Sequence, residues 1–278
     1  MKTRTIVLLA GGVFFFTALI LTIALLPAKK ASEPIQPTVQ TEKAVTGKEE
    51  PHTGSLTFSA ADGLTVTAGL FWTGDASAPF ILLFHQADYS RGEYQDIAPK
   101  LNALGYNCLA VDQRSGGQVN GIKNQTYLAA KEKNLPTGYT DAYLDLEAAL
   151  RFVEQEYQPK QLIVWGSSYS AALSLILASQ HRDEISAVLA FSPGEYFKFD
   201  GKQIVDYAES ITHPAFITSG DWEVKSWQGI ADQIKSEGSV FFVPKGIGLH
   251  GSASLDRDAP NPDEYWAAVK AFLASLEP

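Results

Sequence analysis

Cysteine and positive charge are scarce in this chain, and each shortage excludes a class of protein. Cys108 is the only cysteine among 278 residues, so no intrachain disulfide and no thiolate metal cluster can form. Lysine and arginine number 22 against 31 acidic residues, and no basic block offsets the formal charge of −9. Because proteins bind the phosphates of nucleic acids mainly through positive charge, we expect no nucleic-acid partner.

Motifs for metals and phosphate-bearing cofactors are also missing. The sequence has no zinc-ligand spacing and no glycine-rich motif of the kind that cradles phosphates. We therefore expect neither a metal nor an organic cofactor. Apolar residues make up 45% of the chain and charged residues 19%, which is the balance of a globular protein with a packed core.

The longest uncharged run lies near the N-terminus. Residues 6–27 contain no charged side chain, and about 20 helical residues span the roughly 30 Å hydrocarbon core of a bilayer. This run predicts a transmembrane anchor over residues 1–28, with the rest of the chain outside the cytoplasm. A cleaved signal peptide and a secreted protein are the alternative, although Leu26 or Lys29 would then occupy a position that cleavage sites give to a small residue.

Residues 29–54 have the composition of a flexible linker. They are polar, broken by proline and poor in large apolar side chains, so they bury too little surface to offset the entropy of ordering. The folded domain is therefore expected over residues 55–278.

Within that domain, apolar runs of strand length alternate with helical patterns, which is typical of a mainly parallel sheet covered by helices on both faces. The first two runs flank a turn at residues 61–63 and predict an antiparallel hairpin. The eight expected strands are residues 55–60, 64–72, 80–85, 107–112, 162–166, 185–192, 215–220 and 239–244. The expected helices are residues 94–105, 139–157, 170–181, 226–238 and 262–276.

The stretch GSSYS, residues 166–170, turns a buried strand abruptly into a helix. Such a turn needs small residues where strand and helix approach each other, and it leaves one side chain projecting at its apex. The spacing matches G-x-S-x-G with serine in the last position, so Ser168 stands at the apex. A serine presented in this way is a candidate nucleophile.

From about Ser55 to the C-terminus, the chain resembles the α/β-hydrolase superfamily, and within it the dienelactone-hydrolase-like and small bacterial esterase branches. The resemblance implies an α/β-hydrolase fold with a mainly parallel eight-stranded sheet, preceded here by the N-terminal transmembrane helix. It also implies a nucleophile, an acid and a histidine in that order along the chain. Ser168 fills the first place.

The resemblance assigns the base to His250, which lies in a glycine-bracketed loop after the last expected strand. Two carboxylates, Asp221 and Glu223, follow the strand at residues 215–220. The superfamily pattern, counted from Gly220, favours Glu223 as the acid and leaves Asp221 as the alternative.

The remaining site residues also come from the resemblance. The backbone N–H groups of Gln86 and Tyr169 are the expected oxyanion donors. His85, Asp112 and Arg114, in the HQ and DQRSGG stretches, are expected to support the loops beneath the site.

These assignments imply a serine hydrolase that cleaves a carboxylic ester or related acyl compound through an acyl-enzyme. Residues 193–213 are too few for a large lid, so a small or soluble substrate is expected. The alternatives are a peptidase or thioesterase of the same fold, and a non-catalytic hydrolase-fold protein that binds a ligand at the cell surface. Five aromatic residues lie near the predicted site and serve either the substrate pocket or packing: Tyr89, Tyr169, Tyr196, Trp222 and Trp227.

Overall fold

A computed structural model describes residues 50–276 of the chain. The predicted membrane anchor, residues 1–28, and most of the predicted linker lie outside the described residues. Among residues 50–276, no helix combines the length and the apolar character that crossing a membrane requires.

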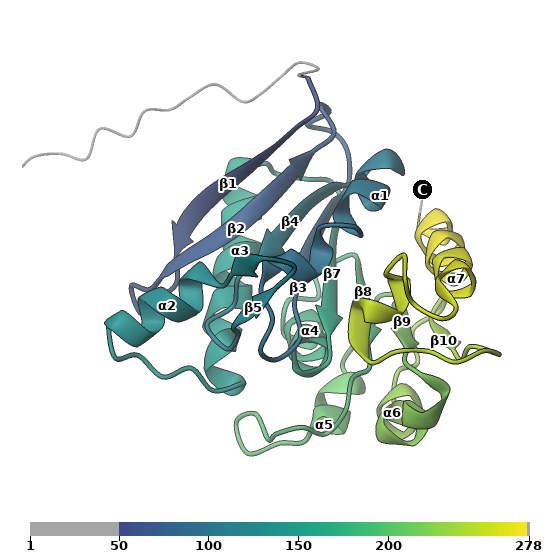
Figure 1. The fold of residues 1–278 in the computed structure, drawn as a ribbon. Helices are drawn as coiled ribbons and strands as arrows, with labels where there is room; N and C mark the ends of the chain where they lie inside the picture. Colours follow the sequence, from purple (N-terminus) through teal and green to yellow (C-terminus); the bar gives the residue numbers. More distant parts are fainter. Residues whose placement is uncertain (1–49, 277–278) are drawn as a thin grey trace, which may run out of the picture. The chain divides into compact units, whose positions relative to one another are not determined.

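The domain is built on an eight-stranded sheet with the order β1-β2-β4-β3-β7-β8-β9-β10. The strands β1 and β2 form the predicted hairpin, β2 pairs antiparallel with β4, and all later neighbours are parallel (Figure 1). This confirms the predicted mainly parallel sheet. The strands are β1 (His52–Ser59), β2 (Thr65–Trp72), β3 (Phe80–Phe84), β4 (Asn107–Val111), β7 (Leu162–Ser167), β8 (Ala187–Phe191), β9 (Ala215–Thr218) and β10 (Val240–Phe242).

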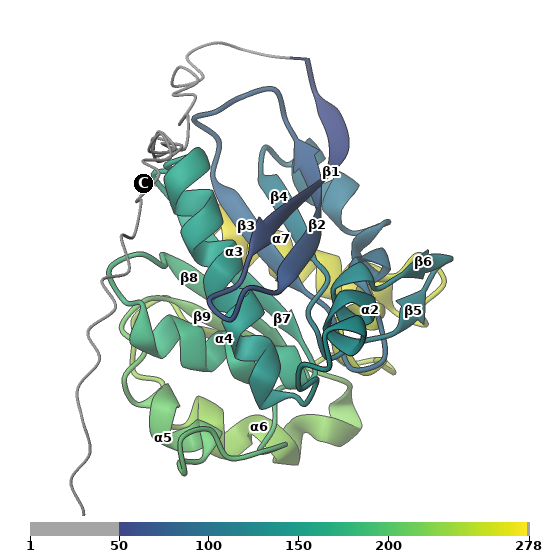
Figure 2. The ribbon, with the colours of Figure 1, turned by 90° about the vertical axis from the view of Figure 1, so that its left-hand side faces the viewer.

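Helices cover both faces of the sheet, as the alternating pattern predicted. Figure 2 shows α3 and α4 in front of the strands and α7 behind them. The central strands are buried on both sides, because their successive side chains point to opposite faces. In β3, Phe80, Leu82 and Phe84 pack in one apolar core, while Ile81 and Leu83 pack in the other. The helices are α1 (Ala98–Ala103), α2 (Gln125–Glu132), α3 (Tyr143–Glu156), α4 (Tyr169–Gln180), α5 (Ile204–Ala208), α6 (Val224–Ala231) and α7 (Pro262–Ser275).

Several boundaries differ from the sequence prediction. The strand β1 begins at His52, within the segment assigned to the linker, because residues 52–54 pair with β2. The helix expected over 94–105 is split into a 3₁₀ turn, Arg91–Tyr94, and the short α1. The long connection after β4 contains α2 and a small hairpin of β5 (Gln118–Val119) and β6 (Ile122–Lys123). Short elements such as α5 carry too little periodicity to be predicted.

The parallel strands all end at one edge of the sheet, and the predicted site residues follow those ends. His85 and Gln86 come after β3, Ser168 comes after β7, and the residues around Glu223 come after β9. In open α/β sheets, ligands bind at this carboxyl edge. The topology therefore gathers residues that are distant in sequence.

Candidate active site

Ser168 lies at the apex of the turn between β7 and α4. Its backbone has φ 59° and ψ −122°, a region that L-amino acids rarely adopt, so the turn is strained in the way common at functional sites. The Ser168 N–H donates to the Phe191 carbonyl of β8 at 2.8 Å. The turn is thereby held against the neighbouring strand, and 8% of the Ser168 surface stays exposed.

The residues on either side of Ser168 explain the sequence of the turn. A Cβ at Gly166 would stand 2.3 Å from the Ser170 carbonyl oxygen, so only glycine fits there. Ser170 replaces the usual final glycine, and its hydroxyl donates to the Phe84 carbonyl at 2.6 Å and accepts the Ser167 N–H at 3.0 Å. Ser170, the residue that departs from the strict motif, therefore joins the turn to β3 through the hydrogen bond to Phe84.

His250 contacts a buried carboxylate. Its Nδ1 lies 2.5 Å from Glu223 Oε1, and the two form an ion pair when the imidazole is protonated. The second oxygen, Glu223 Oε2, accepts the Ser192 hydroxyl at 2.8 Å, and Ser192 Oγ accepts the Gly251 N–H at the same distance. These contacts hold the carboxylate and the histidine loop together.

Of the two carboxylates that the sequence offered as the acid, Glu223 is the one in contact with His250. Glu223 is 7% exposed, whereas Asp221 is exposed to solvent. Within residues 50–276, Asp221 makes no hydrogen bond or ion pair with His250. Both residues belong to a single 3₁₀ turn, Asp221–Glu223. The turn directs Glu223 toward His250 and leaves Asp221 in solvent.

The loop that contains His250 lies directly against the turn that contains Ser168. Ser167 Oγ accepts the Ser252 N–H at 2.9 Å, which joins the residue before Ser168 to the second residue after His250. A Cβ at Gly251 would stand 2.4 Å from Ser167 Oγ. The described contacts include no hydrogen bond between the Ser168 hydroxyl and the His250 ring. The two segments are joined instead by the hydrogen bond between Ser167 and Ser252.

Tyr196 interacts with both Glu223 and Ser168. Burial raises the pKa of Tyr196 to about 12, the negative charge of Glu223 adds to the rise, and a hydrogen bond with the Ser168 side chain opposes it. Its hydroxyl also donates to the Ser192 carbonyl at 2.7 Å. Tyr196 therefore lies between the serine and the acid.

The Gln86 amide, which the sequence predicted as an oxyanion donor, has a partner within the protein. The Gln86 N–H donates to the Glu93 carboxylate, Oε2, at 2.8 Å, so it is already engaged and does not face an open position. The next amide, Ala87, has no hydrogen-bond partner within the described part of the chain. The Tyr169 amide is the first of α4 and has no acceptor within the helix. Ala87 and Tyr169 are therefore the available pair.

Comparisons with known proteins agree with this architecture. A family model described as serine aminopeptidase, S33, matches residues 76–222, more than half of the chain. The chain belongs to this family of α/β hydrolases. The matched region contains Ser168 and ends one residue before Glu223. No curated protein matches the chain.

Solved structures similar to this S33-family chain include esterases and dienelactone hydrolases. An esterase of Pyrococcus furiosus, Pf2001, is 19% identical with a TM-score of 0.62, over 81% of this chain and 93% of its own. Est1E from Butyrivibrio proteoclasticus, solved with ferulic acid, is 16% identical with a TM-score of 0.61, over 80% and 98%. A dienelactone hydrolase from Anabaena variabilis is 14% identical with a TM-score of 0.61, over 82% and 96%. At these identities the likeness shows the fold.

In this family member, His85 and Asp112, which the sequence predicted as loop supports, form hydrogen bonds with several loop groups. The His85 ring bonds the Gln86 carbonyl at 2.7 Å through Nδ1 and the Gln113 amide at 3.1 Å through Nε2. Burial lowers the pKa of His85, which keeps the ring neutral. Asp112 accepts the Arg91 and Gln125 amides at 2.7 and 2.9 Å.

Arg114 has no exposed surface and lies between two carboxylates. Its guanidinium contacts Asp145 at 2.8 Å and Asp62 at 2.6 Å. The charge of Arg114 is thus paired with the buried Asp145 and with the more exposed Asp62, and pairing is the condition under which a buried charge is tolerated. Within residues 50–276, Arg114 has no hydrogen bond or ion pair with Ser168, Glu223 or His250.

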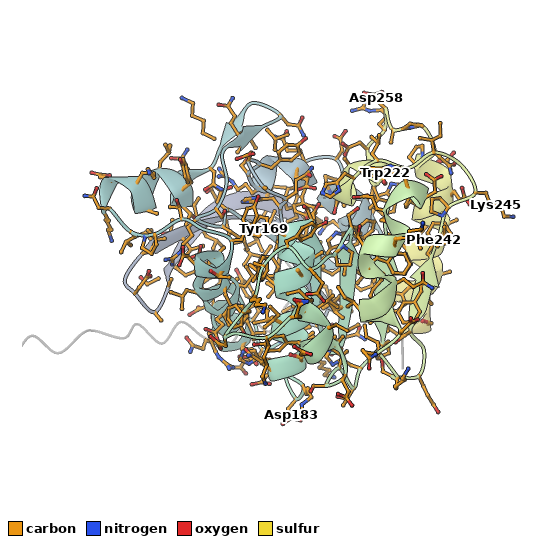
Figure 3. The ribbon with its side chains drawn as sticks, turned by 90° about the horizontal axis from the view of Figure 1, so that it is seen from below. Tyr169, Asp183, Trp222, Phe242, Lys245 and Asp258 are labelled. Atoms are coloured by element: carbon orange, nitrogen blue, oxygen red, sulfur yellow. The ribbon has the colours of Figure 1, made fainter. Side chains whose placement is uncertain are left out.

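The aromatic residues divide between buried and exposed positions. Trp227 is buried, and its indole N–H donates to Ser219 Oγ at 2.7 Å. Tyr169 is also buried and stacks on Tyr139 with ring centroids 4.6 Å apart. Trp222 is 66% exposed, and in the view from below it lies between Asp258 at the edge and Tyr169 near the centre (Figure 3). Tyr139, 41% exposed, had no sequence motif to mark it.

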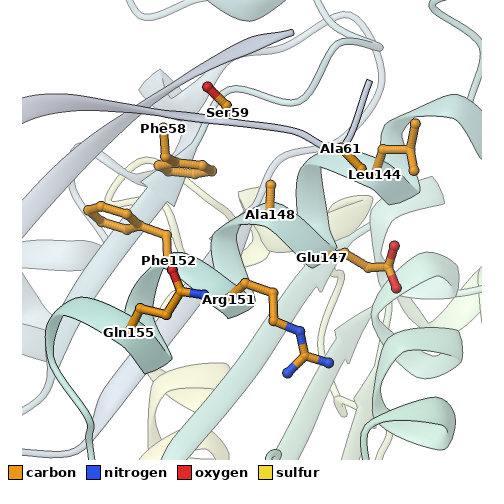
Figure 4. Close-up of a pocket in the computed structure, with 9 residues that line it drawn as sticks. All are labelled: Phe58, Ser59, Ala61, Leu144, Glu147, Ala148, Arg151, Phe152 and Gln155. Carbon is orange, nitrogen blue, oxygen red and sulfur yellow. The ribbon is translucent and has the colours of Figure 1, made fainter. Parts of the chain in front are cut away.

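A groove on another part of the domain contains none of these residues. It has a volume of about 410 Å³ and lies between β1 and α3 (Figure 4). Phe58 and Phe152 form its apolar wall, with Arg151 and Glu147 at its rim. Across residues 50–276, no group of three or more histidine, cysteine or acidic side chains is placed to hold a metal ion.

Proposed function

We propose that the protein is a serine hydrolase that cleaves an ester of a small acyl group through an acyl-enzyme. The observation that carries the proposal is the contact between His250 and the buried Glu223 carboxylate, in a loop hydrogen-bonded to the turn that presents Ser168. A serine hydroxyl is a weak nucleophile unless a base removes its proton, and the base needs an acid to hold its tautomer.

In the proposed reaction, the Ser168 oxygen attacks the substrate carbonyl as His250 Nε2 takes the hydroxyl proton. Glu223 keeps the His250 Nδ1 proton in place and stabilises the imidazolium. The Ala87 and Tyr169 amides donate to the oxyanion, so that charge developing on the carbonyl meets fixed dipoles. The imidazolium then protonates the leaving alcohol. Water, activated by the same histidine, releases the acid.

Three exposed aromatic side chains favour a substrate with an aromatic acyl group. Tyr139, Tyr196 and Trp222 are 41%, 40% and 66% exposed. Offset or edge contacts between aromatic rings contribute about 0.5–1.5 kcal/mol each beyond their area. Est1E, which has the same fold, was solved with ferulic acid, an aromatic acid.

We expect kcat/KM for methyl ferulate to exceed that for methyl butyrate by about tenfold, since one or two ring contacts are worth about 1.4 kcal/mol. The test is steady-state hydrolysis of both esters, with emulsified triolein and alanine p-nitroanilide measured beside them. Faster turnover of triolein than of either small ester would contradict the small-substrate assignment.

A peptidase is the second candidate, because the matching family model is described as a serine aminopeptidase. An aminopeptidase uses the same nucleophile and base but must also hold the free α-amino group of its substrate. Preferential cleavage of alanine p-nitroanilide over both methyl esters in the same panel would favour this candidate over the esterase.

We further propose that residues 1–28 tether the domain to a membrane, with the domain outside the cytoplasm. The uncharged run at residues 6–27 supports this. The full chain is expected in the membrane fraction, released by detergent and not by alkaline carbonate, while a chain lacking residues 1–28 is expected in the supernatant. A mature protein that is shortened by its first 28 or so residues would instead favour the secreted alternative.

A further inference from the structure

A buried carboxylate outside the proposed catalytic residues links the three segments of the site. Glu93, in the 3₁₀ turn after β3, is 3% exposed. Its Oε2 accepts the Gln86 N–H at 2.8 Å, and its Oε1 accepts the Ser167 hydroxyl at 2.7 Å. Ser167 Oγ in turn accepts the Ser252 N–H at 2.9 Å. The chain of hydrogen bonds runs through side chains and amides that are all buried or partly buried.

Each end of this chain lies next to a group that the reaction uses. Gln86 directly precedes Ala87, whose amide is available to the oxyanion. Ser167 directly precedes Ser168, and Ser252 is two residues beyond His250. The Glu93 carboxylate therefore binds two segments directly: the oxyanion loop, which contains Gln86 and Ala87, and the nucleophile turn, which contains Ser167 and Ser168. Through Ser167 it is also linked to the histidine loop, which contains His250 and Ser252. Shifts of about 1 Å among such groups can cost on the order of 100-fold in rate.

Only the ionised carboxylate suits this pattern of donors. Glu93 receives one N–H and one O–H, and a carboxylate accepts both without offering a proton of its own. A protonated Glu93 must donate through one oxygen, so the Ser167 hydroxyl has to turn and find another acceptor. Because the site is buried, an unpaired donor there would be costly, and the loops would relax to avoid it.

The surroundings of Glu93 set how readily it ionises. Burial raises its pKa from 4.5 to about 7, while its hydrogen bonds to Ser167 and Gln86 and the nearby His250 lower it. Asp256 raises it further, and burial raises the pKa of Asp256 itself to about 6. The other titratable side chains that interact with Glu93 are Tyr89, Tyr94 and Tyr169.

We propose that Glu93 is a positioning residue whose ionised carboxylate holds the oxyanion amide, the nucleophile turn and the histidine loop in their working arrangement. This inference rests on the proposed hydrolase function. Protonation of Glu93 breaks the hydrogen bond that the Ser167 hydroxyl donates to it, so activity falls at acid pH through Glu93 as well as through the protonation of the catalytic imidazole.

The first test is Glu93→Gln, which keeps the side-chain shape and removes the charge. We expect kcat for methyl ferulate to fall about 10- to 100-fold with KM changed little, because binding residues are untouched while the reacting groups are misaligned. The acid limb of the pH–rate profile should depend on one proton in the variant and on two in the wild type. Asp206→Asn removes a carboxylate that accepts the Gln203 amide at 2.9 Å in α5, and it should leave kcat and the pH profile unchanged.

Stability provides a readout that does not depend on turnover. The folded protein holds the Glu93 proton more tightly than the unfolded chain, since the pKa rises from 4.5 to about 7 on folding. The contribution of this proton to the free energy of unfolding is therefore complete below pH 4.5, and it is lost as the pH rises through about 7. The denaturant midpoint of Glu93→Gln should therefore match the wild type at low pH and exceed it at pH 8. A purely structural Glu93 would instead lower the midpoint of the variant at every pH.

Ser167→Ala tests the same link if Glu93→Gln fails to fold. Removing the Ser167 hydroxyl takes away a bond that lowers the pKa of Glu93, so the acid limb should move to higher pH. An active wild type whose kcat and acid limb are unaltered in these variants would overturn this inference alone. A wild type that hydrolyses no ester or amide in the panel would overturn the proposed function and this inference together.

Discussion

Ser168→Ala is expected to lower kcat for ester hydrolysis by about 10⁴- to 10⁶-fold and to abolish labelling by a fluorophosphonate probe. The serine oxygen is the atom that forms the acyl-enzyme, and removing a triad nucleophile leaves only the catalysis due to binding and the oxyanion donors. The strained backbone at φ 59° is retained with alanine, which has the same Cβ. The measurements are probe labelling on a gel and steady-state kinetics with methyl ferulate.

Ser174→Ala is the matched control for this experiment. Ser174 is buried in α4, and its hydroxyl has no hydrogen-bond partner within the described part of the chain. Its removal should leave labelling and kcat close to wild type. Labelling that persists in Ser168→Ala would place the nucleophile elsewhere. Absence of labelling in the wild type would favour the non-catalytic binding protein over the enzyme.

Glu223→Gln is expected to lower kcat about 10³- to 10⁴-fold, whereas Asp221→Asn should change it less than about twofold. A triad acid acts by fixing the tautomer of the histidine and by stabilising its cation, and an amide of the same shape does neither. The 2.5 Å contact joins Glu223 to His250, while Asp221 is exposed. The two variants differ from wild type by the same chemical change in the same 3₁₀ turn, so each serves as the control for the other.

The measurement is kcat at the pH optimum for both variants, with the thermal midpoint recorded to show that each is folded. A larger loss in Asp221→Asn than in Glu223→Gln would reverse the assignment. Equal and small losses in both would mean that His250 works without a carboxylate, as a loop histidine with only local hydrogen bonds.

Much of the fold could be read from the sequence, because it depends on local pattern. Buried strands such as β3 and β7 are short continuous apolar runs, and the helix α4 follows its turn immediately. The N-terminal hairpin was also predicted, but its start was placed too late. His52 lies in a polar stretch, and it becomes a strand residue only by pairing with Trp72.

The loop after β3 could be predicted from the sequence only in part. The sequence identifies the HQ pair after β3, but which amide faces the substrate depends on backbone orientation. In the structure the Gln86 N–H points to Glu93, and the amide of Ala87 is left available. Glu93 itself belongs to no motif, and its partner Ser167 is 74 positions away along the chain.

By itself, the sequence determined the alternation of strands and helices, the serine at the apex of the turn, and the loops in which an acid and a histidine would be found. The first two follow from periodicity and from the small residues a tight turn requires, which are local properties, and the third is what the resemblance to the α/β-hydrolase superfamily implies. Only the tertiary structure decided that Glu223 meets His250, that Gln86 is engaged, and that Glu93 joins three loops. Those outcomes depend on side chains brought within 3 Å of one another by strands far apart in sequence, and no local pattern encodes that approach.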